Sequence, residues 1–347
     1  MEMGIWTPLP HTIRAEPRMD AIVETITRPG EGKGLDSGLQ FAIDIVQEAE
    51  RLGFTRTLIA ERWLGPDLEC WMLASALAMH TQNIELIVAV HPGILNPQVT
   101  AKMAATLDRI SDGRAAINIV NGWWQEEFEQ FSNGAWLDRS DDRYARCDEF
   151  MDVLTRLWAG DGSDYQGRFY QLRDATLPSS PLTAPYPPIY TASMSPAGKA
   201  SIAQRGDHWF VTPRSLDLSY NDFNLVAQEM AEEIDLMRET AAKHGRTLGF
   251  GVAGHVICAP TKEEADRAAI DLAEYGNKAM MNAVVSRSII SGLVGTPHMI
   301  AERLSRYEEI GIGFSMLHFH PMSEGLERFA AEVMPLLKHR ETIPATA

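Results

Sequence analysis

The stretch Ile117–Phe150, INIVNGWWQEEFEQFSNGAWLDRSDDRYARCDEF, gives the strongest indication of the architecture of this chain. It begins in a short apolar strand, Ala115–Val120, which contains one amide, Asn118. An amide without a hydrogen bond in an apolar strand costs free energy, so Asn118 needs a partner. A polar group near the end of an inner strand is typical of a barrel that holds a polar ligand. The alternative is an irregular surface loop followed by a helix, and the rest of the chain distinguishes the two.

Short apolar or β-branched runs alternate with helical patterns along the chain. Eight such strands with eight or more helices between them predict an α/β fold, a (β/α)8 TIM barrel with loop insertions, as one domain over residues 1–347. An open doubly wound sheet with a small second domain is the alternative. The expected strands are Met3–Thr7, Thr57–Ala60, Ile84–Val90, Ala115–Val120, Pro188–Thr191, His208–Val211, Phe250–Cys258 and Phe314–Phe319.

The helical patterns repeat apolar residues at helical spacing, as Ile43, Val46 and Ala49 do. Two irregular insertions, Arg28–Ser37 and Leu177–Pro188, are expected to be either binding loops or surface decoration. The expected helices are Leu39–Leu52, Leu68–His80, Pro97–Ile110, Arg143–Trp158, Pro196–Gln204, Asn221–His244, Lys262–Glu274, Pro297–Ile310 and Glu324–Leu337.

Composition excludes several classes of partner. The formal net charge of −16 leaves no large basic surface for nucleic acid or an anionic membrane. No run is long enough to span a membrane, and there is no apolar signal segment at the start. Three cysteines (Cys70, Cys147 and Cys258) lie far apart and follow no metal or redox spacing. We therefore expect a cytoplasmic protein.

Several catalytic motifs are absent from the sequence. There is no strand–GxGxxG–helix unit, no Walker A motif, no HExxH and no GxSxG. The ten histidines are scattered, and none pairs with acids at metal-ligand spacing. A Rossmann dinucleotide site is therefore not expected, and neither is a metal site.

Two Ser/Thr-Pro pairs open helices directly after strands. Ser195-Pro196 follows PPIYTAS, and Thr296-Pro297 follows Leu293–Gly295. Such a helix start can bind a phosphate through its free N–H groups, or the side chain can simply cap the helix. The local pattern does not distinguish the two candidate phosphate sites.

Arg143 and Tyr144 begin the helix after the tryptophan-rich loop. A guanidinium and a phenol suit a phosphate or a ribityl chain. The alternative is a charged first turn in which Arg143 pairs with Asp141 or Asp142.

Histidines lie in or just after three of the expected strands. His255 and His320 are placed where side chains point into a barrel mouth, and His318 should face the same side as His320. His91 follows the third strand in the same way. Such residues can transfer protons or bind substrate, or they can be hydrogen-bonded core residues.

Two further pairs follow strands. Glu61 and Arg62 could form part of the floor of a site or an internal salt bridge. Trp123 and Trp124 could flank a planar ligand or anchor the core.

One long block resembles a known family. The segment VAVHPGILNPQVTAKMAATLDRISDGRAAINIVNGWWQEEF, followed by DDRYARCDEFMDVLTRLW, resembles the bacterial luciferase-like, flavin-dependent monooxygenases. Within them it is similar to the branch of alkanesulfonate, dimethylsulfone and pyrimidine monooxygenases. The resemblance runs from Met3 to about Leu337, and its AATLDRISDGR and DDRY pieces are specific to the family.

The resemblance implies a TIM barrel that uses reduced FMN, supplied by a separate NAD(P)H-dependent flavin reductase, together with O2. Members of the family usually pair, so a homodimer or homotetramer is implied. It selects Ser195 over Thr296 as the phosphate cap and makes His255 an active-site histidine. Its flavin-binding positions fall on Glu61, Arg62, Asn118, Glu127, Arg143, Tyr144, Ser193 and Ser195.

Departures from the sulfonate enzymes indicate the substrate. Their arginine two residues before the active-site histidine is Ala253 here, and their late tyrosine is replaced by His320. Their active-site cysteine has no clear match, since Asp67 falls nearest and Cys70 is displaced. A buried sulfonate without a charge partner is costly, so a small neutral or weakly polar substrate is expected, most simply a sulfone.

The resemblance therefore implies insertion of one oxygen atom next to sulfur, with C–S cleavage. His255 and His320 are the expected proton-transfer residues, and Asn118 is expected near the reactive edge of the flavin. Three alternatives stay open: opening of an amide or heterocycle, which Ala89 on the third strand weakens, a deazaflavin-dependent oxidoreductase, and a non-catalytic flavin-binding protein. The expected substrate-binding residues are His91, Trp123, Trp124 and Arg287.

Overall fold

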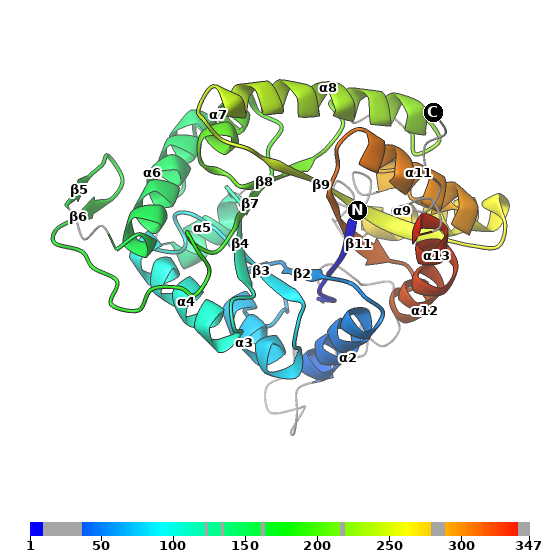
Figure 1. Cartoon of the computed structure of the whole chain (residues 1–347), viewed down its shortest axis with the longest axis horizontal. Helices are drawn as coiled ribbons and strands as arrows, with labels where there is room; N and C mark the ends of the chain where they lie inside the picture. The colour runs from blue at the N-terminus through cyan, green and yellow to red at the C-terminus, as the bar shows by residue number, and fades with distance from the viewer. Residues whose placement is uncertain are drawn as a thin grey trace, which may run out of the picture.

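Eight parallel strands close into a ring at the centre of the molecule (Figure 1). The ring closes because β1 pairs with both β2 and β11, and β8 pairs with β9. This confirms the predicted (β/α)8 barrel and excludes the open sheet. The eight strands are β1 (Glu2–Trp6), β2 (Arg56–Ile59), β3 (Glu85–Val90), β4 (Ala115–Ile119), β7 (Ile189–Thr191), β8 (His208–Val211), β9 (Gly249–Cys258) and β11 (Phe314–Phe319).

The structure is a computed structural model, and it describes residues 1–9, 37–121, 124–132, 135–160, 164–215, 219–278 and 289–338. Helices surround the ring (Figure 1). They are α2 (Ser37–Arg51), α3 (Cys70–His80), α4 (Pro97–Ile110), α5 (Gln125–Phe131), α6 (Ser140–Trp158), α7 (Pro196–Arg205), α8 (Phe223–Ala242), α9 (Lys262–Lys278), α11 (Pro297–Glu309), α12 (Met322–Arg328) and α13 (Met334–Lys338).

Most predicted bounds agree with the structure to within a few residues, and α4 agrees at both ends. Four features were not predicted: α5, the hairpin of β5 (Tyr165–Gln166) and β6 (Gln171–Leu172), the short β10 (Val294–Gly295) beside β9, and a π-helical turn at Phe329–Val333. That turn divides the predicted final helix into α12 and α13. The predicted loop Arg28–Ser37 lies outside the described residues, apart from Ser37 at the start of α2.

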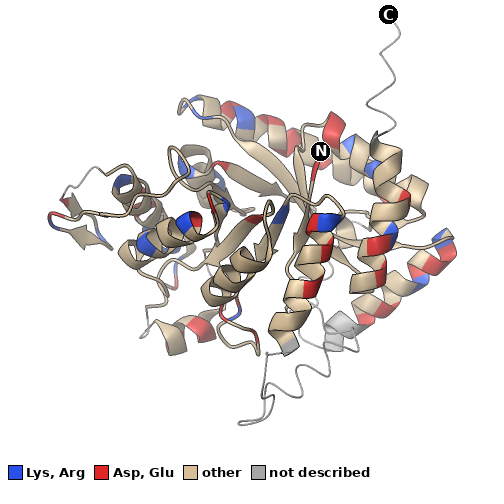
Figure 2. Ribbon diagram, turned by 60° about the horizontal axis from the view of Figure 1, so that its bottom comes forward, with Lys and Arg blue, Asp and Glu red and all other residues tan. Residues whose placement is uncertain are grey.

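The described residues form two main apolar cores and a third, small cluster beside β9, β10 and α9. The larger main core lies between the strands and the surrounding helices, whereas the smaller main core fills the ring itself. Charged residues lie mainly on the outer helices (Figure 2). None of the helices in the described part of the chain is both long and apolar enough to cross a membrane. The residues that fill the ring are Leu58, Ile87, Ala116, Tyr190, Phe210, Phe314 and Met316.

A polar cluster closes the amino-terminal end of the ring. Arg56 pairs with Glu2 and lies 3.7 Å from Glu85, and its Nη1 donates to the Tyr190 hydroxyl at 3.3 Å. The Tyr190 hydroxyl in turn donates to Glu85 at 2.8 Å. With the apolar core above it, this cluster leaves the carboxyl ends of the strands as the place for a site.

The DRISDGR part of the family-like block forms the turn that leads into β4. Asp112 and Gly113 both have positive φ, 58° and 82°, which glycine adopts freely and aspartate tolerates. The buried Asp108 carboxylate accepts hydrogen bonds from the Leu182 and Thr183 N–H groups at 2.6 and 2.8 Å. It therefore fixes the predicted insertion Leu177–Pro188 against α4.

Arg114, the last residue of this turn, ties α3 to β4. Its guanidinium donates to the carbonyls of Ala78 and Ile84, each at 2.9 Å, and of Ser111 at 2.7 Å. It also donates to the Thr81 hydroxyl at 2.9 Å and the Thr81 carbonyl at 3.2 Å. One side chain therefore satisfies carbonyls at the end of α3 and in the loop before β3.

We expect Arg114→Ala to lower the free energy of unfolding by about 3 kcal/mol, because several hydrogen bonds are lost and buried carbonyls are left without donors. Urea unfolding followed by circular dichroism measures this change. Arg51→Ala is the matched control, since that exposed arginine pairs with Glu48 alone among the described residues, and its expected effect is below about 0.5 kcal/mol. Equal effects of the two substitutions would contradict the role given to Arg114.

Candidate functional site

Polar side chains converge at the carboxyl ends of the strands. Asn118 of β4 and His255 of β9 are both buried, at 7% and 5% exposure. The Asn118 Oδ1 and the His255 Nδ1 are closed to solvent and have no hydrogen-bond partner within the described residues. A buried polar atom without a protein partner is costly, so both atoms are candidates for a hydrogen bond with a bound ligand or water.

Three aromatic rings stack at this end of the barrel. The His318 ring lies between Trp6, at 4.5 Å between centroids, and His255, at 4.6 Å. Burial, followed by the nearby His320, lowers the pKa of His255 to about 3. Burial also lowers the pKa of His320. The predicted convergence of His255, His318 and His320 is therefore observed, and His255 is neutral at pH 7.

A cluster of hydroxyl groups lies at the start of α7. The Tyr144 and Ser193 hydroxyls are 2.6 Å apart, and the Ser193 and Ser195 hydroxyls are 3.2 Å apart. Ser195 caps the helix by accepting the Gly198 N–H at 3.1 Å. A Cβ at Gly198 would lie 2.0 Å from the Ser193 Oγ, so only glycine lets these groups meet. Three hydroxyls at a helix N-terminus form a cradle suited to a phosphate.

The second Ser/Thr-Pro pair lacks such a cradle. Thr296 accepts the Met299 N–H at 3.4 Å and so caps α11. Within the described part of the chain, no second hydroxyl group is hydrogen-bonded to it. The geometry therefore favours Ser195 over Thr296 as a phosphate site.

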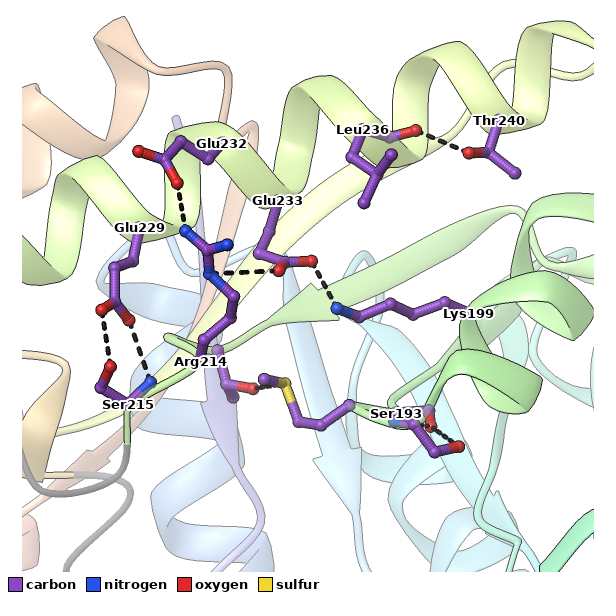
Figure 3. Close-up of polar contacts among 12 residues, drawn as sticks. Ser193, Lys199, Arg214, Ser215, Glu229, Glu232, Glu233, Leu236 and Thr240 are labelled. Atoms are coloured by element: carbon purple, nitrogen blue, oxygen red, sulfur yellow. Dashed lines mark hydrogen bonds and ion pairs between the residues drawn. The ribbon is translucent and has the colours of Figure 1, made fainter.

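A salt-bridge network connects the cradle helix to α8 (Figure 3). Lys199 of α7 pairs with the buried Glu233 of α8, which lies 3.5 Å from Arg214. Ser215 donates its N–H and its hydroxyl to Glu229 at 2.9 and 2.6 Å. The Lys199 charge is thus directed to α8, and an anion at the start of α7 would be bound by the hydroxyl groups and not by this lysine.

Arg143 does not pair with an acid of its own first turn. Its Nη1 donates to the carbonyls of Leu137 and Asp138 at 2.6 and 3.0 Å, and its guanidinium lies 4.5 Å from the Trp136 ring centroid. Asp142 pairs with Arg168 instead. The predicted pairing of Arg143 with Asp141 or Asp142 is therefore wrong, because carbonyls of the preceding loop are closer partners. A cofactor contact by Arg143 stays a prediction.

Arg62, Trp124 and Glu127 form one group beside the mouth. The Arg62 guanidinium lies 2.6 Å from the Glu127 carboxylate and 3.2 Å from the Trp124 ring centroid. Glu127 is buried at 2% exposure. The structure thus brings two predicted flavin-binding residues together with one predicted substrate-binding residue, and the predicted salt bridge of Arg62 is made to Glu127.

Glu61 lies at the start of α3, where its Oε2 accepts the Cys70 N–H at 2.9 Å. Burial, followed by the charges of Glu69 and Asp67, raises its pKa to about 7. The possible metal-binding atoms of Glu61, Glu69 and Cys70 lie within 4.8 Å of one another. The Glu61 carboxylate accepts the Cys70 N–H, and the Glu69 carboxylate accepts the Met72 N–H at 2.9 Å. The two carboxylates therefore cap α3.

Cys70 itself is a core residue. Its thiol is fully buried, and it donates to the Ala89 carbonyl at 3.4 Å. Burial raises the pKa of this thiol well above its usual range. Cys70 is therefore a poor substitute for the family's active-site cysteine, because a protonated thiol is a weak nucleophile.

His91 has a partner that the sequence analysis missed. The Trp63 indole N–H donates to the His91 Nδ1 at 3.3 Å, so a neutral His91 has its proton on Nε2. Trp63 follows Arg62 directly after β2, and this position at the end of a strand could have indicated that Trp63 belongs to the site. Two other predicted substrate-binding residues, Trp123 and Arg287, lie outside the described residues.

Comparisons with known proteins cover most of the chain. The sequence model of the luciferase-like monooxygenase family matches residues 19–313. The FMNH(2)-dependent dimethylsulfone monooxygenase of Pseudomonas putida is 28% identical over 330 residues, which cover 86% of this chain and 87% of that relative.

Solved structures share the fold. The EDTA monooxygenase of Chelativorans sp. BNC1 superposes with a TM-score of 0.77 at 16% identity, covering 99% of this chain and 95% of its own. An F420-dependent secondary alcohol dehydrogenase reaches 0.71 at 17% identity, covering 97% and 98%. At these identities the likeness concerns the fold alone.

The raised pKa of Glu61 predicts a pH-dependent stability. The folded protein keeps a proton on Glu61 that the unfolded chain releases between pH 4.5 and 7, so this contribution is complete at low pH and is lost as the pH rises through 7. Relative to Glu61→Gln, we expect the wild type to lose on the order of 2 kcal/mol of unfolding free energy between pH 5 and 8. Urea unfolding at several pH values measures this, and parallel stability curves for the two proteins would contradict it.

Proposed function

Because the chain belongs to the luciferase-like monooxygenase family, we propose that it is a two-component monooxygenase that uses reduced FMN to insert one atom of O2 into a small organic substrate. The hydroxyl cradle of Ser193, Ser195 and Tyr144 at the start of α7 is the observation that carries this proposal. A flavin phosphate fits it, because Gly198 leaves the space and the helix N-terminus favours an anion.

The residues for the rest of the cofactor lie along the same end of the barrel. Reduced FMN, when bound, supplies the electrons that activate O2. Asn118 offers its unpartnered Oδ1 to a flavin N–H group. Arg62 and Glu127 form a fixed charged pair beside it, and Trp124 covers the guanidinium. These side chains orient the flavin and exclude water from the reacting centre.

The mouth favours an uncharged substrate. His255 is neutral, and position 253 holds an alanine where a sulfonate-binding enzyme needs a cation. Arg62 is already paired with Glu127. We therefore infer a sulfone or a related organosulfur compound with C–S cleavage, in line with the name of the Pseudomonas putida relative. We assign to His255 and His320 the task of holding or moving a proton at their ring nitrogens, and to His91 and Trp124 contact with the substrate.

A separate NAD(P)H-dependent flavin reductase is the inferred partner, because no dinucleotide motif in this chain could reduce FMN. A cytoplasmic location is part of the same proposal, and it is supported by three cysteines that are all free and buried.

We also infer that the chain assembles as a homodimer or homotetramer. Helix α3 is uncharged from Cys70 to Met79, and Met72 and Met79 on it are 68% and 74% exposed. An exposed apolar helix face on a chain of net charge −16 favours contact with a second copy, since like charges oppose association elsewhere.

We expect reduced FMN to bind more tightly than oxidised FMN in an anaerobic titration, and oxygen then to be consumed when dimethyl sulfone is added. Gly198→Ala should weaken reduced-FMN binding by about tenfold or more, because the added Cβ overlaps the Ser193 hydroxyl. Thr296→Ala is the matched control, and its affinity should equal that of the wild type. Sulfonates and amides complete the substrate screen.

Other outcomes of this titration would point elsewhere. Tighter binding of a deazaflavin than of reduced FMN would favour a hydride-transferring oxidoreductase. Tight binding of oxidised FMN without oxygen consumption would favour a non-catalytic flavin-binding protein. Turnover of an amide or heterocycle but of no sulfone would favour ring or amide opening.

The double variant Met72→Glu, Met79→Glu should be monomeric in light scattering, because four acids would meet at the interface of a dimer. Leu236→Glu is the control, since that residue is 53% exposed on α8, away from α3. A monomeric wild type, or an unchanged mass in the double variant, would refute the inferred interface.

A further inference from the structure

The His255 ring is held without a hydrogen bond from any described residue, which is unusual for a buried histidine. Its Nδ1 is closed to solvent without a partner among those residues. A functional histidine is usually held by a hydrogen bond from one ring nitrogen, which fixes its orientation. Some other contact has to fix the His255 ring.

The ring stack provides that contact. β11 and β9 are neighbours in the barrel (Figure 1), and their register places His318 directly beside His255. The two ring planes differ by 11°, with centroids 4.6 Å apart. On its other side, His318 stacks on Trp6 of β1 at 26°. His318 is thus enclosed between two rings and is only 3% exposed.

The arrangement separates two tasks. His318 has both ring faces covered, so it cannot present a face to a ligand. His255 has one face against His318, and its nitrogens are not engaged by protein groups within the described residues. Stacking therefore orients the imidazole without using either of its nitrogens, which a hydrogen bond would do.

We propose that His318 is a positioning residue: it fixes the ring plane of His255 by stacking, so that no protein hydrogen bond is needed to hold the imidazole. The inference deepens the proposed function and rests on it for the substrate, whereas the positioning itself is a property of the protein without ligands. Trp6 is the outer support of the stack. A flat ring at position 318, and not its nitrogens, is what the role requires.

The test compares His318→Phe, which keeps a ring, with His318→Leu, which has a similar bulk and no ring. Histidine side chains labelled with ¹⁵N and ¹³C are followed by NMR in the full chain, without flavin or substrate, over a pH titration. In the wild type and in His318→Phe, we expect one sharp set of His255 signals that stays neutral down to about pH 5. In His318→Leu, the His255 signals should broaden or split, and its pKa should rise by about 1 or more.

Two results would overturn the inference: His255 signals and titration in His318→Leu that match the wild type, or damage in His318→Phe equal to that in His318→Leu. His320 is the titratable group that influences His255 most strongly, so His320→Gln is recorded as a reference for its electrostatic effect. Thermal melts of all variants identify a global loss of structure. If His318→Leu fails to fold, Trp6→Leu removes the outer ring, and the same broadening is expected in it.

The NMR measurement does not depend on turnover. A failure of reduced FMN to bind would therefore refute the proposed function and leave the positioning role intact. With dimethyl sulfone as the probe substrate, His318→Leu is expected to lower kcat by about tenfold with a smaller change in KM, because a misoriented base affects the chemical step more than binding. His318→Phe should retain wild-type kcat to within about threefold.

Discussion

Closure of the parallel sheet is the constraint on which the rest of the structure depends. Once β1 is paired with both β2 and β11, every second side chain of each strand must point into one enclosed space. The lower layers of that space are filled by apolar groups and by the Arg56 cluster, so polar side chains at the carboxyl ends have a single region in which to meet. Asn118 and His255, which are 137 positions apart in the chain, come to lie on two strands of the same ring in this way.

Burial gives this mouth its electrostatic character. Removing imidazoles from water disfavours their charged form, which keeps His255 neutral. The same effect acts on Glu61 in the opposite direction and keeps a proton on it near neutral pH. The charged pair of Arg62 and Glu127 beside the mouth is mutually neutralised. The site therefore has hydrogen-bonding capacity with little net charge, a combination that suits a polar but uncharged ligand.

Much of the fold could be predicted from the sequence, because strand and helix periodicity are local properties. The α4 bounds followed from Pro97 at the first helical position and from the SDG turn after Ile110. The π-helical turn and α5 could not be predicted, since neither has a distinct periodic pattern of its own. Phe329–Val333 fits an ordinary helix in the sequence, and only packing against other elements shows where the register changes.

The site was predicted in its location better than in its contacts. Strand alternation was enough to predict that His318 and His320 face the same side, whereas the stacking of His255 on His318 depends on the register of β9 and β11. The partners of Arg143 and the Trp63–His91 hydrogen bond depend on how loops cross one another, which no local pattern records. Asp108 and Arg114 carry much of the family resemblance, yet the structure places them at the end of α4 and just before β4, at the opposite end of β4 from the site.

The closed amino-terminal end of the barrel has a consequence for the order in which ligands bind. Within the described residues, Arg56, Tyr190 and Glu85 close one end and apolar side chains fill the middle, so a ligand reaches the interior from the carboxyl ends of the strands. A ligand that binds deep in the mouth must therefore enter before a second ligand that covers it. It can leave only after that second ligand has left. A barrel that is open at one end therefore favours ordered binding. The order in which two ligands bind and dissociate is set by the geometry of the barrel and not by their affinities.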